Sequence, residues 1–198
     1  MAIDGGAHAS HATNGMKDRP VLATARLMLR RPEVGDIASI VAIAGDWQIS
    51  SRLGRVPYPY SEQDAQAFLR DIVPNEWTWA ITLRVSGEFV GVIGLHPEEP
   101  DVAELGYYVA RRHWGRGIAT EAVLSIIHYG QSIGLRRIIA GHFVNNPASG
   151  RVLQKAGFVE TGRTERSCLA SGITMPSIEM EIVNGISAAP YIASSPAD

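Results

Sequence analysis

Residues 104–121 read ELGYYVARRHWGRGIATE, and they join a predicted strand to a predicted long helix through two glycines. The first N–H groups of a helix have no intrahelical partner and carry about half a positive charge between them. Gly115 and Gly117 would let a phosphate approach the bare backbone at this point. Three arginines add positive charge to the same segment: Arg111, Arg112 and Arg116. The segment predicts a phosphate-binding turn, although the same residues also suit an ordinary solvated turn.

Two better-known phosphate motifs do not fit this turn. A dinucleotide fingerprint needs a third glycine three residues after Gly117, where the chain has Thr120. A P-loop needs Gly-Lys followed by Ser or Thr, and the sequence contains no such run. Hydride transfer and P-loop phosphoryl transfer are therefore disfavoured.

The apolar period on either side of the turn predicts the neighbouring elements. Residues 77–85 alternate in a way that is typical of a strand, and Ser86-Gly87 is a turn signal that leads into a second strand over 89–95. With Ala103–Val109 these strands predict an antiparallel meander. A helical period then runs from Ala119 to about Gly134.

Turn and cap residues divide the rest of the chain. Ser61 with Asp64 is a capping-box variant that opens a helix, and Asn146-Pro147 opens another that stops at Gly157. The remaining predicted elements are a strand over 26–31, a helix over 34–44, a buried strand over 137–144 and strands at the end of the chain. This order predicts an α/β (α+β) fold of three layers. A central mixed, mostly antiparallel and twisted sheet of about seven strands carries helices on both faces.

Composition and charge limit the class of protein. The 198 residues suit one domain over 20–183, and the segments 1–19 and 184–198 have the composition of flexible ends. A net charge of −2 argues against nucleic acid, and no apolar run reaches the roughly 18 residues of a membrane span. The single cysteine, Cys168, indicates a reducing cytoplasm and reads as structural. His8 and His11 are too few for a metal site, so we expect no metal.

The turn Arg112-x-x-Gly115-x-Gly117 resembles the acyl-coenzyme A signature of the GNAT N-acetyltransferases. Further blocks resemble the ribosomal-protein N-terminal acetyltransferases of the Rim type, and the resemblance covers about residues 21–183. These blocks are Thr24-Ala-Arg-Leu-Met-Leu-Arg30, Pro57-Tyr-Pro59, Glu104-Leu-Gly-Tyr107, Trp114-Gly-Arg-Gly-Ile-Ala-Thr-Glu-Ala122 and Asn146-Pro-Ala-Ser-Gly-Arg-Val-Leu-Gln-Lys-Ala-Gly-Phe158.

The resemblance implies a cofactor site. The diphosphate of coenzyme A would lie on the N–H groups of Arg112 to Ala119, and the pantetheine arm would pair with Tyr108 to Ala110. The acetyl carbonyl would meet a strand N–H near Val109. The implied cofactor residues are Tyr108, Val109, Ala110, Arg112, Gly115, Arg116, Gly117, Ile118, Ala119, Asn146 and Ser149.

The same resemblance implies direct attack of an amine on acetyl-CoA. Glu104 is the predicted base, on a strand face shared with Gly106 and Tyr108, although it also suits an ordinary exposed strand carboxylate. Many family members protonate the leaving thiolate with a tyrosine, but Leu153 stands at that position here. In the Rim-type branch an Asn-x-x-Ser arrangement occupies the start of this helix. The resemblance thus implies Asn146 and Ser149 here, with Ser149 as the acid, although Asn146 also suits a helix cap.

Other candidate residues carry weaker signals. His113 and His142 are close to the predicted site in sequence, but isolated histidines more often pack or face solvent. Trp77 and Trp79 are typical of a core, and Pro57 to Tyr60 is the better candidate for contact with the acceptor.

These patterns lead to one functional hypothesis and one alternative. The hypothesis is an acetyl-CoA-dependent N-acetyltransferase whose acceptor is a protein N-terminal α-amine or a small-molecule amine. The alternative is a non-catalytic module that binds or senses acyl-CoA. The resemblance also implies that a homodimer is possible.

Overall fold

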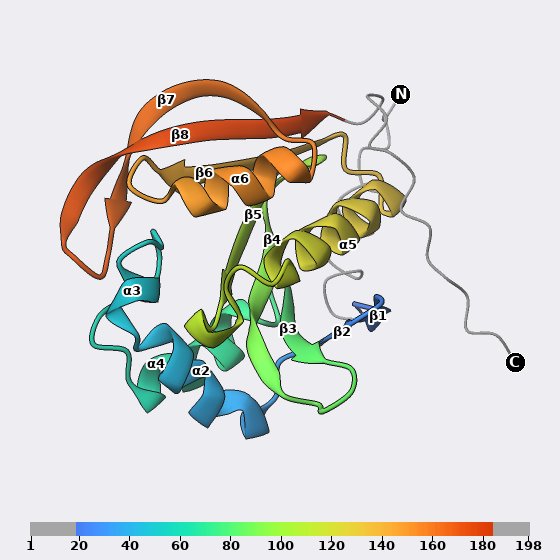
Figure 1. Ribbon diagram of the computed structural model, residues 1–198, viewed down its shortest axis with the longest axis vertical. Coiled ribbons are helices and arrows are strands. Elements are labelled where there is room, and N and C mark those ends of the chain that lie inside the picture. Colours follow the sequence, from blue (N-terminus) through green and yellow to red (C-terminus); the bar gives the residue numbers. More distant parts are fainter. Residues whose placement is uncertain (1–18, 184–198) are drawn as a thin grey trace, which may run out of the picture.

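The computed structural model describes residues 19–183, which form one eight-stranded sheet with helices on both faces (Figure 1). The strand order is β1-β2-β3-β4-β5-β6-β8-β7. The strands are β1 Leu22–Ala23, β2 Leu27–Arg30, β3 Trp77–Leu83, β4 Phe89–Glu99, β5 Val102–Val109, β6 Arg137–Phe143, β7 Val159–Cys168 and β8 Ile173–Val183. The predicted order of elements is confirmed, and the strand beyond the predicted seven is the two-residue β1.

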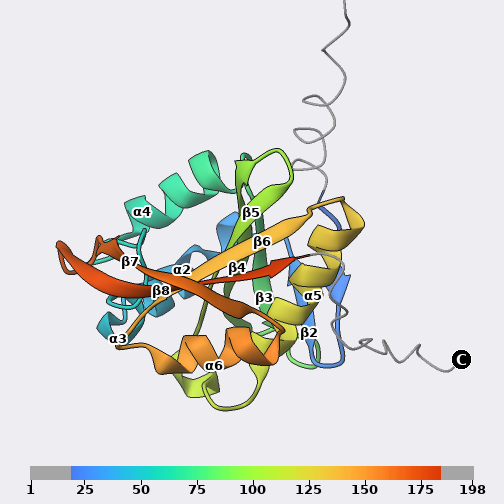
Figure 2. The same cartoon turned by 90° about the horizontal axis from the view of Figure 1, so that it is seen from above.

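Helices lie on both faces of the sheet. They are α2 Ile37–Ala44, α3 Trp47–Ser50, α4 Glu62–Ala67, α5 Ile118–Ser132 and α6 Pro147–Lys155, with short 3-10 turns at Val34–Asp36 and Arg111–His113 and a π turn at Phe68–Ile72. Figure 2 shows α5 and α6 on one side of the sheet and α2 and α4 toward the other.

Strand β3 is buried on both faces of the sheet, and each face belongs to a different hydrophobic cluster. Trp79 and Ile81 pack with Ile126 of α5 in one buried cluster, and Ala80 packs with Ile40 of α2 in a second cluster on the opposite face. The alternation in this strand therefore separates two buried faces, and even the threonines between the apolar residues are buried. Strand β3 is therefore covered on both sides, as is typical of a sheet with helices on both faces.

The sheet opens between β5 and β6. These parallel strands pair only where Val102–Glu104 faces Arg137–Ile139, after which β5 stays with β4 and β6 stays with β8. Residues 105–109 therefore have a strand neighbour on one edge alone. Because Ala110 donates its N–H to Val90 on β4 at 2.8 Å, and successive N–H groups of a strand point to opposite edges, the N–H of Val109 faces the open gap.

Several local predictions are confirmed at helix ends. Ser61 and Asp64 form a reciprocal capping box at the start of α4, and the side chain of Asn146 caps α6. Gly134 and Gly157 end the helices α5 and α6 with φ values of +88° and +97°, which other residues rarely adopt.

The burial of Arg19, the first described residue, does not match the domain boundary predicted between residues 19 and 20. Arg19 was placed in the flexible segment, but it is 8% exposed and donates to the carbonyl of Thr78 at 2.7 Å. The predicted flexible ends otherwise lie outside the described residues, as do His8 and His11. Within residues 19–183, no helix is long and apolar enough to cross a membrane, and no group of three or more metal-ligating side chains is found.

Candidate functional site

A cavity of about 740 Å³ lies where β5 and β6 separate. Its wall combines β5, the turn before α5, the start of α6 and the loop after α3. Most of the predicted site residues line it: Glu104, Tyr108, Val109, Gly115, Gly117, Ile118, Ala119, Asn146 and Ser149. Ala110, Arg112 and Arg116, which the sequence also predicted, are not among its lining residues.

The N-terminus of α5 opens onto this cavity. Gly117 is the N-cap residue with a φ of +77°, and no side chain caps the helix. The first backbone bond of the helix runs from Glu121 N–H to the Gly117 carbonyl, so that the N–H groups of residues 118–120 have no helical acceptor. Gly115, with a φ of +74°, leaves open space beside the turn. This arrangement can hold an anionic group on backbone N–H donors.

The arginines of the turn differ in their partners. Arg112 forms an ion pair with Glu88 at 2.8 Å, and Arg111 forms one with Asp46 at 2.9 Å. Hydrogen bonds from His113 and Arg112 lower the pKa of the Glu88 carboxyl below its usual value. Arg116 has no salt bridge to any residue between 19 and 183. Glu88 would therefore compete with a cofactor phosphate for Arg112. Arg116 has no such competing carboxylate among the described residues.

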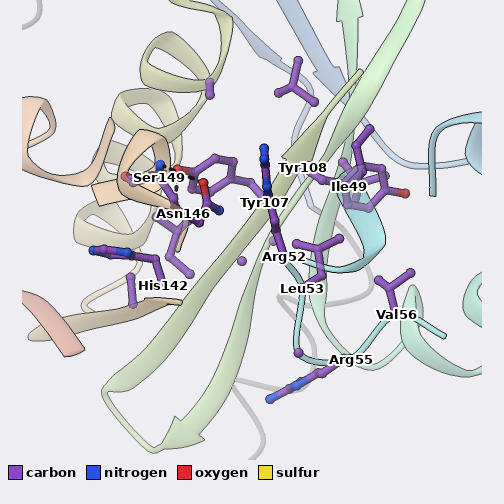
Figure 3. A pocket seen from close by; sticks show the side chains of 18 of the residues that line it. Ile49, Arg52, Leu53, Arg55, Val56, Tyr107, Tyr108, His142, Asn146 and Ser149 are labelled. Atoms are coloured by element: carbon purple, nitrogen blue, oxygen red, sulfur yellow. Dashed lines mark hydrogen bonds between the residues drawn. The ribbon is translucent and has the colours of Figure 1, made fainter. Parts of the chain in front are cut away.

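Ser149 and Asn146 stand together at the start of α6, with Tyr107 beside them (Figure 3). The Asn146 side chain accepts from Ser149 N–H at 3.4 Å, and it also lines the cavity, so that the cap and a ligand contact are compatible. The hydroxyl of Ser149 lies 2.9 Å from that of Tyr107 on β5. Burial raises the pKa of Tyr107 to about 12, and the bond to Ser149 opposes this shift. Tyr107 is therefore a neutral phenol at physiological pH, and sequence reasoning did not select it.

Glu104 reaches the cavity from the opposite face of β5. Its Oε1 accepts from Arg166 of β7, and its Oε2 lies 3.5 Å from Arg55. Arg166 also pairs with Glu179 of β8, and these partners raise its pKa. Gly141 lets the guanidinium lie close to β6, because an added Cβ there would meet the Arg166 Cζ at 2.7 Å. The predicted base is thus a partly buried, doubly paired carboxylate.

His96 is a titratable cavity residue that sequence reasoning missed. It lies on β4 directly opposite Glu104, and its Nδ1 contacts the carboxylate of Glu76. The predicted strand ended at Leu95, one residue short of His96. The predicted antiparallel meander makes these two strands neighbours, but the sequence alone does not give the register that places His96 opposite Glu104.

His113 and His142 also line the cavity, and like Cys168 they are buried against neighbouring groups of the fold. His113 is buried with Nε2 3.1 Å from Glu88, and His142 is buried with Nδ1 3.0 Å from the carbonyl of Phe143. Cys168 is buried, and its Sγ lies 3.7 Å from the carbonyl of Ser51 after α3.

The side of the cavity that lies across β5 from α6 is formed by the loop after α3 and by α4. Figure 3 shows Ile49, Arg52, Leu53, Arg55 and Val56 across β5 from Ser149 and Asn146. Pro57 and Tyr60 of the predicted acceptor loop also line the cavity, whereas Tyr58 packs against Trp47 with ring centroids 4.9 Å apart. The prediction that Trp77 and Trp79 belong to the core is confirmed.

Comparisons with known proteins agree with this geometry. The model of the acetyltransferase (GNAT) domain family matches residues 26–159. An uncharacterized N-acetyltransferase of Bacillus subtilis, YoaA, is 33% identical over 150 residues, which cover 72% of this chain and 85% of that protein. The ribosomal-protein-serine acetyltransferase of Escherichia coli is 40% identical over 78 residues, which cover 38% of this chain and 44% of that protein.

A solved structure has the same fold. The spermidine N-acetyltransferase from Vibrio cholerae, crystallised in complex with CoA and spermine, superposes with a TM-score of 0.69 at 23% identity. The superposition covers 79% of this chain and 95% of that chain. The family match spans most of the folded region, and it includes the turn before α5 and all of α6. The chain belongs to the GNAT family of acetyltransferases.

Proposed function

We propose that this protein transfers the acetyl group of acetyl-CoA to a primary amine by direct attack. The observation that supports this most strongly is the uncapped N-terminus of α5, which opens onto the cavity at the end of the β5 edge that lacks a strand partner. An anion site followed by an unpaired strand edge suits a molecule with a diphosphate at one end and an extended amide-containing arm. No metal takes part in the proposed reaction.

In this proposal the diphosphate lies on the N–H groups of residues 118–120, with Arg116 beside it. The pantetheine arm then pairs with the open edge of β5, where the N–H groups of Val109, Tyr107 and Leu105 face the gap. Because the arm separates the diphosphate from the thioester, Val109 pairs with the arm. The thioester carbonyl then meets the N–H of Tyr107, about 7 Å further along the strand, rather than the N–H near Val109 that the resemblance implies.

The proposed N–H donor would stabilise the oxyanion that forms when the amine attacks. A backbone donor that is fixed before the reaction begins needs no reorganisation in the transition state. Direct attack requires no covalent enzyme intermediate, in agreement with the buried position of Cys168. The thiolate that leaves would take its proton from the Ser149 hydroxyl, which the Tyr107 phenol resupplies across their 2.9 Å contact. Ser149 and Tyr107 would thus replace the tyrosine that the family often places at Leu153.

The amine must lose a proton before or during the attack. About 15% of an α-amine with a pKa near 7.7 is neutral at pH 7, whereas only about 0.04% of a lysine is. Glu104, the base predicted from the sequence, lies in the cavity as a candidate for this role. The acceptor is an α-amine of a protein N-terminus or a small-molecule amine. One named relative is a ribosomal-protein-serine acetyltransferase, and the solved structure is that of a spermidine N-acetyltransferase. We place the reaction in the cytoplasm.

The test is an acetyl-CoA consumption assay with pools of N-terminal peptides and of small amines. We expect turnover with at least one pool, and titration calorimetry with coenzyme A should give saturable heat. Saturable heat without turnover over both pools would favour the non-catalytic module that binds acyl-CoA. If neither experiment gives a signal at millimolar concentration, the proposed function is wrong.

A further inference from the structure

We propose that His96 accepts the proton from the attacking amine and that Glu76 positions its imidazole. This inference rests on the proposed acetyl transfer and names a further catalytic residue for it. It begins from a histidine and a carboxylate that contact each other inside the cavity, from segments 20 residues apart.

The contact with Glu76 selects one form of the imidazole. Nδ1 of His96 faces a carboxylate oxygen of Glu76, and both side chains are about one-fifth exposed. A carboxylate accepts hydrogen bonds, so that Nδ1 carries the proton in the neutral ring and Nε2 keeps its lone pair. An imidazole held in this way has its basic nitrogen directed away from Glu76.

The position of Nε2 follows from Gly106 on β5. A Cβ added at Gly106 would lie 3.0 Å from His96 Nε2 and 3.5 Å from His96 Cδ2. The basic nitrogen therefore occupies the space directly above the Gly106 backbone, and the absent side chain is what admits it. Gly106 precedes Tyr107, whose N–H is the proposed oxyanion donor.

The two proton-transfer groups then lie on opposite faces of β5. Side chains alternate along a strand, so that Gly106 opens to the His96 face while Tyr107 turns to Ser149 at α6. A thioester held at the edge between these faces would receive the amine from the His96 side. Its sulfur would leave toward Ser149.

The charges that face His96 come from four further segments. Glu76 precedes β3, Glu104 lies opposite on β5, Arg166 reaches in from β7, and Arg55 comes from the loop after α3. Arg55 lies 3.6 Å from Glu76 and 3.7 Å from Glu98 of β4 itself. Guanidinium groups face both oxygens of Glu104, whereas Nε2 of His96 has no hydrogen-bond partner among the described residues. His96 is thus the better placed acceptor, and Glu104 serves as the counter-ion of Arg166.

The proton balance is complete without a further reactant. The amine nitrogen forms its bond to the acetyl carbon and gives one proton to His96 Nε2. The carbon–sulfur bond breaks, its electron pair goes to sulfur, and the thiolate takes a proton from Ser149. The imidazolium then releases its proton to water, and water restores the hydroxyl proton through Tyr107.

Four variants test the assignment: H96Q, E104Q, E76Q and H128Q. H128Q is the control because His128 is exposed on α5. We expect H96Q to lower kcat by about a hundredfold to ten-thousandfold. It should also abolish the acid limb of the pH profile, which is the fall of kcat at low pH. The Kd for coenzyme A should stay within about twofold in H96Q. E104Q should keep that limb, E76Q should move it to lower pH, and H128Q should behave as the wild type.

Contrary outcomes separate this inference from the proposed function. Turnover and an unchanged acid limb in H96Q, or loss of the limb in E104Q alone, would overturn the role of His96 while acetyl transfer stands. Absence of turnover in the wild type with every amine would overturn both. ¹⁵N NMR of the wild-type histidines gives a readout that does not need activity. We expect the Nδ1–H form for His96, and an Nε2–H form would contradict the proposal.

Discussion

The hydroxyl of Ser149 contacts the phenol of Tyr107. Among the hydrogen bonds of residues 19–183, this phenol is the only side-chain group that can donate a proton to Ser149. Its value for catalysis lies in the raised pKa of Tyr107, about 12, which keeps the phenol protonated over the whole working range. In the proposed mechanism the pair can therefore donate a proton to the leaving thiolate at any physiological pH. The same two hydroxyls would be useless as a base.

Removal of either hydroxyl tests this relay. We expect S149A to lower kcat by about a hundredfold, at the lower end of acid catalysis, because a thiolate leaves readily. Y107F should lower kcat less, since water can then resupply Ser149. The double variant should resemble S149A alone, because groups that act in one path are not additive. Steady-state kinetics measure all three, and full additivity of the two losses would contradict a shared path.

The arginines of the turn give a second comparison at the level of single side chains. We expect R116A to weaken coenzyme A binding by about fivefold, equivalent to the roughly 1 kcal/mol of an exposed ion pair. R112A should weaken it less, because Arg112 already pairs with Glu88. Calorimetry with coenzyme A at low and high salt measures both values. Equal losses in the two variants would mean that Arg112 leaves Glu88 when the cofactor binds.

Among single residues, sequence reasoning found those that lie next to one another in the chain. The turn before α5 and the cap of α6 are local features, so that their glycines and Asn146 were predicted correctly as turn and cap residues. His96 and Arg166 meet Glu104 across strands, and one sequence does not give the register that joins them. The partner of Arg112 is 24 residues away and was missed for the same reason.

At the scale of elements, the close approach of β4 and β5 depends on Gly91. A Cβ added there would lie 2.1 Å from the carbonyl oxygen of Tyr108, well inside any possible contact. The strands would have to move apart beside the open edge. Glycine is thus required at this position by the neighbouring backbone, independently of its own dihedral angles.

The substitution G91A measures this constraint. We expect it to lower the free energy of unfolding by about 3 kcal/mol, at the upper end of overpacking effects, because backbone cannot swing aside as a side chain can. Urea unfolding gives the value. G162A is the matched control in β7, since an added Cβ there would meet nothing within 4 Å. A loss in G91A no larger than in G162A would show that the two strands adjust freely.

The helices and strands could be predicted from the sequence more closely than the gap between β5 and β6. Periodicity predicted β3, β5 and α5 to within about two residues, because each follows one apolar repeat. The separation of β5 from β6 carries no such repeat, and it depends on where the pairing of two distant strands stops. The cavity was therefore inferred from the resemblance rather than from the pattern of residues.

For the whole molecule, the gap divides the sheet into two parts that are joined at its closed end. β1 to β5 carry α2 and α4, and β6 to β8 carry α6, while Arg166 of β7 reaches across to Glu104 of β5. A ligand in the gap would touch both parts at once. In the proposed function, acetyl-CoA bound in this gap would therefore raise the stability of the fold.

Tyrosines around the cavity make the stability of the whole fold depend on pH. Burial raises the pKa of Tyr60 and of Tyr107 to about 12, and burial also raises the pKa of Tyr108. In the unfolded chain these phenols ionise near pH 10. Between these values the unfolded chain has lost protons that the folded chain keeps, so that their stabilising contribution is complete below pH 10 and is lost as pH rises through about 12.

We therefore expect the free energy of unfolding to fall from about pH 10 upward, by about 1.4 kcal/mol per pH unit for each proton retained. Urea titrations at pH 8, 10 and 11 measure the slope. Y108F removes one of the three phenols without removing its ring, so its slope above pH 10 should be shallower than that of the wild type. An unfolding free energy that stays constant up to pH 11 would show that water reaches these hydroxyls in the folded protein, and the burial that raises their pKa values would then be wrong.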